Sequence, residues 1–272
     1  MLLYDGDCPM CRVYSHAFVK AKMLEQKGIM SYDHASGEVR STIDTDRARN
    51  EIALVNVKDQ KVIYGVDSWF TIFTNSFPFL RSAEKFPPFY WFMKSLYLLI
   101  SYNRRVIAPG KVLHRDGACD PDYNIIWRWI YIAVTSCIVG FILSNYFGGI
   151  VIYQNAQLGF YTEWLIATGQ LVFQGVIVFF IRKDRLLHYF GQLMTISMIG
   201  SLLLIPVILL NRIFTALPSE TYLLYFTFPV TIMLWQHIRR IKILELPSFL
   251  TITWIGYRLL LLVLFYFYTL KS

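Results

Sequence analysis

Long apolar runs dominate the chain after Asn124 and limit what it can fold into. Each run is close to the ~20 residues that a helix needs to cross the hydrocarbon core of a bilayer. Hydrophobic residues make up 56% of the 272 residues and charged residues only 16%, which excludes two ordinary soluble domains. We therefore predict an all-α transmembrane bundle of about five spans over residues 125–272. The candidate spans are about Trp129–Val151, Trp164–Ile181, Leu186–Leu210, Tyr222–Gln236 and Phe249–Leu270.

Basic residues flank these apolar runs. From Ile125 onward there are 10 Lys and Arg against 4 Asp and Glu, within a formal net charge of +8. This distribution fits membrane topology and argues against a nucleic-acid partner. The basic clusters at 182–185 and 239–242 lie between spans two and three and spans four and five, so the positive-inside rule puts both in the cytoplasm. With an odd number of spans, the N-terminal domain is predicted to be cytoplasmic and the C-terminus outside. Met1 leads into a strand pattern and not into a signal-peptide pattern.

Before Ile125 the sequence alternates short apolar runs with charged and glycine-containing stretches. Strands are predicted at Met1–Tyr4, Ile29–His34, Ile52–Val57 and Val62–Tyr64, the last two as a hairpin. Helices are predicted at Pro9–Lys27 and Val66–Phe77. The order strand, helix, strand, irregular or helical stretch, hairpin, helix is that of a thioredoxin-like core. We therefore predict an α/β thioredoxin-like domain over residues 1–124.

An aromatic-rich run follows these elements, from Phe86 to Tyr102, and is interrupted by Lys94 and Ser95. Its uninterrupted apolar stretches are too short to span a bilayer. We predict an amphipathic helix that covers the domain or rests on the membrane surface, in preference to a sixth span.

The chemistry of the sequence centres on Cys8-Pro9-Met10-Cys11, which follows a predicted strand and opens a predicted helix. At a helix N-terminus, free N–H groups and the helix dipole stabilise a thiolate, so Cys8 is the candidate nucleophile. The two-residue spacing brings Cys11 within bonding reach, so Cys11 can resolve a mixed disulfide formed at Cys8. The pattern therefore predicts dithiol redox chemistry.

Two other interpretations of the cysteine pair stay open. A zinc site needs two further ligands, and the sequence has no second C-x-x-C motif, although Cys119 with His114 could complete one. The pair could also be inert packing or a degenerate site. We prefer the redox interpretation, in which no metal is bound.

The segment Tyr4-Asp5-Gly6-Asp7-Cys8-Pro9-Met10-Cys11 resembles the Y-D-G-x-C-x-x-C signature of the DCC family of thiol-disulfide oxidoreductases. Weaker similarities follow in order at the strand before Lys58-Asp59, at Gly65, at Asn103-Arg104 and at Cys119, so the resemblance covers roughly residues 1–120. It implies a thioredoxin-like fold and dithiol redox chemistry, with Cys8, Cys11 and Asp5 as site residues. One departure from thioredoxin architecture is that Asn50-Glu51, and no proline, precede the strand at Ile52.

Asp5 has two possible roles. A buried carboxylate could accept the proton of Cys11 during resolution. Alternatively, Asp5 could fix the turn between strand and helix through hydrogen bonds to backbone amides.

The membrane half offers a possible intramembrane polar site. Arg258 lies nine residues into the last span, where a charge is costly and faces a bundle interior, water or a lipid headgroup. Gln170 and Gln174 share one face of the second span and could line a polar cavity or bond across helices. His237 is predicted to be interfacial and Cys137 to be a small packing residue.

These patterns predict a membrane-anchored thiol-disulfide oxidoreductase at the cytoplasmic face. Its partners would be a protein or small-molecule thiol or disulfide, and the lipid bilayer. No cofactor beyond the redox-active disulfide is predicted, although the sequence leaves a quinone open. The alternative is a transporter or membrane-embedded redox protein whose bundle is the working part and whose cysteine domain is a redox sensor or partner-binding module.

Overall fold

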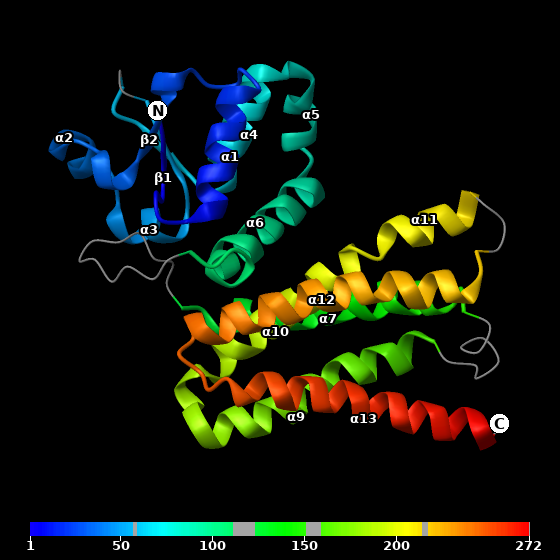
Figure 1. Ribbon diagram of the computed structural model, residues 1–272. Helices are drawn as coiled ribbons and strands as arrows, with labels where there is room; N and C mark the ends of the chain where they lie inside the picture. The colour runs from blue at the N-terminus through cyan, green and yellow to red at the C-terminus, as the bar shows by residue number, and fades with distance from the viewer. Residues whose placement is uncertain (57–58, 111–122, 151–158, 214–216, 272) are drawn as a thin grey trace. The chain divides into compact units, whose positions relative to one another are not determined.

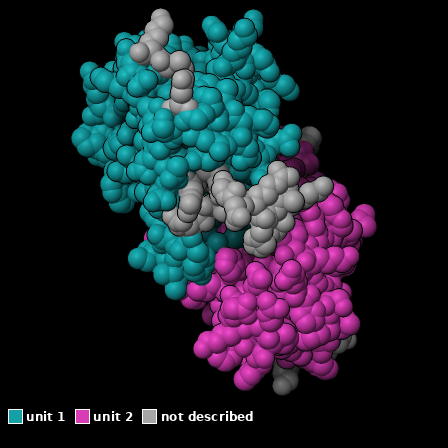
Figure 2. All heavy atoms as spheres, turned by 90° about the vertical axis from the view of Figure 1, so that its left-hand side faces the viewer, with its two compact units in different colours: residues 1–128 teal, residues 129–272 magenta. Residues whose placement is uncertain are grey.

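The computed structural model describes residues 1–56, 59–110, 123–150, 159–213 and 217–271. The chain forms two compact units, Met1–Arg128 and Trp129–Ser272, which Figure 2 shows in teal and magenta. The predicted boundary lies at residue 124, and the helix that begins at Ile125 contributes its first turn to unit 1.

Unit 1 is built around a mixed four-stranded sheet with the order β2-β1-β3-β4. The strands are β1 (Leu2–Tyr4), β2 (Ile29–Ser31), β3 (Ala53–Val55) and β4 (Val62–Tyr64). β1 pairs in parallel with β2 and antiparallel with β3, which pairs antiparallel with β4. Successive residues of β1 point to opposite faces, and both faces are covered: Leu2 packs in a cluster with Phe18 and Ile72, and Leu3 in one with Ile43.

The helices of unit 1 follow the predicted order. They are α1 (Pro9–Lys20), α2 (Gly37–Ser41), α3 (Thr45–Asn50), α4 (Val66–Ser76), α5 (Arg81–Glu84) and α6 (Pro87–Ile107), with short 3₁₀ turns at Gln26–Gly28, Tyr32–His34 and Pro78–Leu80. The prediction that the first helix reaches Lys27 is wrong. Lys22 adopts a φ of 57° and its N–H bonds to Val19 O, an arrangement that closes the helix end seven residues earlier.

Helix α6 is fixed to the rest of unit 1 by three polar contacts along one side. The Tyr90 hydroxyl donates to Asp67 Oδ1 at 2.9 Å, the Tyr97 hydroxyl accepts from Ile52 N at 2.9 Å, and the Ser101 hydroxyl donates to Asn50 O. The predicted amphipathic helix is therefore present and covers the domain. It extends to Ile107, which brings its last turn to the start of α1.

Unit 2 is helical, and its helices run alongside one another (Figure 1). They are α7 (Ile125–Phe147), α9 (Phe160–Arg182), α10 (Leu186–Leu202), α11 (Ile205–Ile213), α12 (Ser219–Ile243) and α13 (Phe249–Lys271), with a 3₁₀ turn at Lys183–Arg185. Small residues let helices approach closely: a side chain at Gly175 would meet Phe190, and one at Gly200 would meet Met233.

Two stretches in the described residues are long and apolar enough to cross a membrane, Ile125–Phe147 and the consecutive helices between Phe160 and Ile213. A shorter apolar helical stretch runs from Phe249 to Leu264. The count of about five spans therefore stays a prediction. The third predicted span is not one helix, because it breaks between Leu202 and Ile205, where Pro206 has no N–H to donate to the preceding turn.

Candidate active site

The candidate site lies where β1 ends and α1 begins. Asp5, Gly6 and Asp7 form the connecting loop, and Cys8 is the N-cap residue of α1 with an extended backbone. Its Sγ accepts a hydrogen bond from Cys11 N at 3.5 Å, in the place of the oxygen that usually caps a helix. Pro9 occupies the first turn, where its missing N–H has no intrahelical partner to lose. The local sequence therefore places the Cys8 sulfur at the positive end of the helix.

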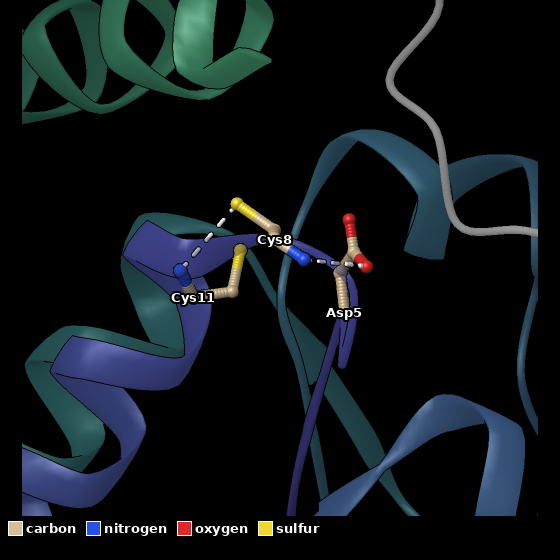
Figure 3. Close-up of side chains that lie close together, drawn as sticks. All are labelled: Asp5, Cys8 and Cys11. Atoms are coloured by element: carbon tan, nitrogen blue, oxygen red, sulfur yellow. Dashed lines mark hydrogen bonds between the residues drawn. The ribbon is translucent and has the colours of Figure 1, made fainter. Parts of the chain in front are cut away.

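Cys8, Cys11 and Asp5 form one compact cluster. The two Sγ atoms and a carboxylate oxygen of Asp5 all lie within 4.8 Å of one another, and both cysteines are free thiols. Figure 3 shows the two sulfurs next to each other, with Asp5 on the other side of the Cys8 backbone. The C-x-x-C spacing and this proximity are compatible with a disulfide between the two sulfurs.

The two thiols differ in acidity. Hydrogen bonds from the Cys11 thiol and backbone, together with the Arg104 charge, lower the pKa of Cys8 to about 6, although burial and Asp5 oppose this. The pKa of Cys11 is raised, first because its thiol donates to Cys8 and then because it is buried. The pair is thus arranged as a thiolate at Cys8 and a protonated thiol at Cys11, the asymmetry that ordered attack and resolution require.

Asp5 is held by groups from both ends of unit 1. Its Oδ1 accepts from the N–H of Asp7 at 2.9 Å and of Cys8 at 3.1 Å, and its Oδ2 lies 3.5 Å from Arg104 and 3.1 Å from Arg105. The carboxylate is only 5% exposed. These contacts match the turn-fixing role, and they tie the loop before Cys8 to the last turns of α6.

Arg104 is a site residue whose charge the sequence did not connect with the cysteines. It entered only as part of the Asn103-Arg104 similarity to the family. It lies on α6 and is 4% exposed. Its positive charge acts to lower the pKa of each cysteine, although the hydrogen bond to Cys8 and burial keep the pKa of Cys11 raised. Its neighbour Arg105 also donates to Asp7 O at 3.3 Å. The signal in the sequence is a pair of adjacent arginines on the buried end of an amphipathic helix, but nothing local indicates their partner.

Tyr14 is a second missed residue, one helical turn after Cys11. Burial raises the pKa of its hydroxyl, and the adjacent Cys11 adds to the effect. Tyr14, Cys11, Asp5 and Arg104 are among the residues that line a cavity of about 10 Å³. That volume suits a single water molecule, so this cavity is too small to hold a substrate.

Both sulfurs are covered in this structure, since Cys8 is 0% and Cys11 2% exposed. The backbone after α6 approaches the loop around Cys8: a Cβ added at Gly110 would lie 2.6 Å from Asp7 O and 3.2 Å from Pro9 Cδ. A partner disulfide can therefore reach the Cys8 sulfur only after the segments of this protein that cover it move.

A metal site is chemically conceivable from two thiolates and one carboxylate, but the surroundings oppose it. The Asp5 oxygens already contact two guanidinium groups and two N–H groups. Within the described parts of the chain the cluster offers three ligands and not the four of a closed zinc site. Cys119 and His114, the two residues that could complete a zinc site, lie outside the described residues.

Replacing Arg104 with methionine should raise the pKa of Cys8, because the substitution removes a buried positive charge that stabilises the thiolate. The measurement is the far-ultraviolet absorbance of the thiolate against pH, which does not depend on access to the sulfur. The wild-type midpoint is expected near pH 6. Arg12→Met is the control: Arg12 is exposed, so its charge is screened and the midpoint should stay in place. Equal midpoints for Arg104→Met and wild type would contradict the assignment.

The predicted intramembrane glutamines bond across helices. Gln170 Nε2 donates to Trp254 O at 3.4 Å, and Gln174 Nε2 donates to Leu250 O at 3.5 Å and to Thr253 Oγ1 at 3.2 Å. Both side chains of α9 therefore bond to α13, which is the second of the two roles that their spacing allows. Arg258, also on α13, places its guanidinium 5.7 Å from the Trp254 ring centroid.

His237 faces the interior of the helical bundle, and its predicted interfacial position stays a prediction. It is 0% exposed, and its ring nitrogens lie 3.1 Å from the Tyr189 hydroxyl and 3.2 Å from Thr251 Oγ1. The Tyr189 hydroxyl in turn donates to Gln174 Oε1 at 3.2 Å, so one polar network joins α9, α10, α12 and α13. Cys137 was predicted to be a small packing residue. It is instead exposed on α7 and does not fill the protein interior.

Comparison with known proteins supports the redox interpretation for unit 1. Residues 2–108 match the family model of the DCC1-like thiol-disulfide oxidoreductases. No curated protein matches the chain, and no solved structure matches it.

Proposed function

We propose that the DCC1-like domain at residues 2–108 makes this chain a membrane-anchored thiol-disulfide oxidoreductase that exchanges disulfides through Cys8 and Cys11 at the cytoplasmic face. One observation carries the proposal: the sulfur with the lowered pKa caps α1 within 4.8 Å of a second thiol. A thiol with a pKa near 6 is about 90% thiolate at pH 7, against about 3% for an ordinary cysteine.

The architecture around the pair supports a thioredoxin-like core. The sheet order β2-β1-β3-β4, with a parallel first pair and an antiparallel second half, places the cysteines directly after the central strand β1. All peptide bonds in the described residues are trans, and Glu51 and Ile52 stand before β3. A partner that docks beside β3 therefore contacts backbone that contains no cis-proline.

The reaction follows from the acidity of the two thiols. The Cys8 thiolate attacks one sulfur of the partner disulfide, forms a Cys8–partner disulfide, and expels the other partner sulfur as a thiolate, which takes a proton. Cys11 then loses its proton and attacks the Cys8 sulfur, which releases the second partner thiol and leaves a Cys8–Cys11 disulfide. The partner gains two electrons and the pair loses two. A cellular thiol reductant returns the pair to the dithiol form by the reverse exchange.

The cytoplasmic setting favours the reductase direction, because a reducing compartment keeps the pair as a dithiol at rest. The partner is a protein or small-molecule disulfide. Because Cys8 is 0% exposed, the partner gains access only when chain around the site moves.

The membrane half supports the proposed orientation through contacts within unit 2. Arg185, before α10, lies 3.7 Å from Glu245, after α12, so the two basic loops meet at one end of the bundle. Trp129, in the second turn of α7, contacts Phe190, near the start of α10, at 6.3 Å between ring centroids. The first predicted span therefore begins at the same end as the basic loops, which the positive-inside rule assigns to the cytoplasm.

A redox titration tests the proposal. The full-length protein in detergent is equilibrated with dithiothreitol mixtures of increasing potential, and intact mass and peptide mapping report the state of each cysteine. We expect a reversible two-electron transition that converts Cys8 and Cys11 into a disulfide, with Cys137 unchanged. A pair that never oxidises, or that co-purifies with stoichiometric metal, would overturn the proposal.

A further inference from the structure

Helix α6 carries an apolar face that is exposed in the described part of the chain, with Phe89 also in contact with Phe70. Phe89, Phe92, Leu96 and Ile100 follow one another at three- and four-residue spacings, so they lie on one side of the helix and form what we call the α6 aromatic face. Their exposed fractions run from 37% for Phe89 and Leu96 to 58% for Phe92. Several large side chains exposed together on one helix face mark an interaction surface.

The orientation of this face is fixed. Tyr90, Tyr97 and Ser101 hold a different side of α6 against the sheet domain by hydrogen bonds. Rotating the aromatic residues inward would break these bonds, so the α6 aromatic face stays outward in the folded domain.

The C-terminal half of α6 contacts the first turn of the first predicted span, within unit 1. Asn103 Nδ2 donates to Trp127 O at 3.1 Å, and the Tyr102 and Trp127 rings stack with centroids 6.3 Å apart and planes 9° apart. The start of a spanning helix lies at the headgroup level, where tryptophan and tyrosine gather. These contacts therefore tie α6 to the first turn of the predicted span.

The charges on α6 and just before it match an anionic surface. Arg81, Lys85 and Lys94 are exposed, and Glu84 is the one acidic residue between Phe77 and Ile107. Arg104 and Arg105 are engaged with Asp5 and do not belong to this set. Aromatic residues beside lysine and arginine are the pattern of a helix that lies in the interface of a membrane with anionic lipids.

We propose that the α6 aromatic face inserts into the headgroup region of the anionic leaflet from which α7 enters the membrane, so that the lipid surface is a second attachment site for the redox domain. The inference rests on the membrane anchoring in the proposed function and does not depend on the redox chemistry. Because α6 also carries Arg104 and Arg105, the same helix connects the lipid surface to the cysteine site.

Nitroxide labels test the depth of the face. The full chain, with its four native cysteines replaced by serine, receives one new cysteine at a time and is reconstituted into nanodiscs of phosphatidylcholine and phosphatidylglycerol. Phe92→Cys reports the α6 aromatic face. Val13→Cys is the matched control, because Val13 is apolar and 71% exposed on α1. Ile138→Cys, 41% exposed on α7, reports whether the predicted span enters lipid.

We expect the label at residue 92 to collide more often with oxygen, which partitions into lipid, than with a water-soluble nickel complex. The label at residue 13 should show the reverse order, and the contrast should weaken in nanodiscs of phosphatidylcholine alone. If the label at residue 92 behaves like that at residue 13, or is shielded from both reagents by protein, while the label at residue 138 reports lipid, the inference is wrong. If the label at residue 138 does not report lipid, the membrane anchoring itself is wrong.

Discussion

Cys8→Ser should abolish disulfide reduction by the full-length protein, and Cys11→Ser should stop the reaction halfway, as a Cys8–partner disulfide. Serine is a favoured N-cap residue, so the hydroxyl at position 8 can still accept from Cys11 N and α1 keeps its start. A serine at position 11 can still donate to the Cys8 thiolate but cannot attack its disulfide. Both effects are therefore chemical and not consequences of unfolding.

The measurement combines turnover of a disulfide substrate with non-reducing gel electrophoresis of the protein after exposure to substrate. Cys137→Ser is the control, because this thiol is exposed on α7 and does not belong to the Cys8–Cys11 cluster, so its loss should leave turnover unchanged. Turnover that survives Cys8→Ser would remove the assignment of Cys8 as nucleophile. A Cys11→Ser variant that turns over at the wild-type rate without accumulating an adduct would show that resolution uses another thiol.

The parts of the fold that sequence predicts well are those set by local patterns. The alternation of apolar runs in the first 77 residues predicts the order of strands and helices that the structure has. The start of α1 at Pro9 follows from its position after β1. The cap at Cys8 and the proline in the first turn are local signals as well. The end of α1 was missed because Lys22 adopts a left-handed conformation, which favours glycine, so that no sequence signal marks it.

The parts that sequence does not predict are contacts between distant segments. Asp5 and Arg105 are 100 positions apart, and only the return of α6 to the start of α1 makes them an ion pair. The approach of Gly110 to Asp7 and Pro9 has the same origin, since it follows from the return of α6 to the start of α1. His237 sits beside a basic cluster in sequence, which indicates an interface, but the helix turns its ring into the bundle toward Tyr189.

Asp5 contacts both the loop before Cys8 and the two arginines of α6, so its replacement should produce the second large effect. Asp5→Ala removes the acceptor of the Asp7 and Cys8 N–H groups and the counter-charge of Arg104 and Arg105. Removing one partner of a buried ion pair costs roughly 3–5 kcal/mol, because an uncompensated charge remains. We expect a fall of this size in the free energy of unfolding of unit 1, measured by urea titration of tryptophan fluorescence.

Asp5→Asn separates the two roles of the carboxylate. Asparagine keeps an oxygen for the two N–H groups but loses the charge, so the stability loss should be smaller than for Asp5→Ala, and the pKa of Cys8 should fall because the carboxylate that raises it is gone. The decisive readout is the decay rate of a preformed mixed disulfide at Cys8. Because two guanidinium groups already neutralise the carboxylate, we expect it to be a poor proton acceptor and the decay rate to stay at the wild-type value. A slower decay at wild-type stability would instead identify Asp5 as the base that takes the Cys11 proton.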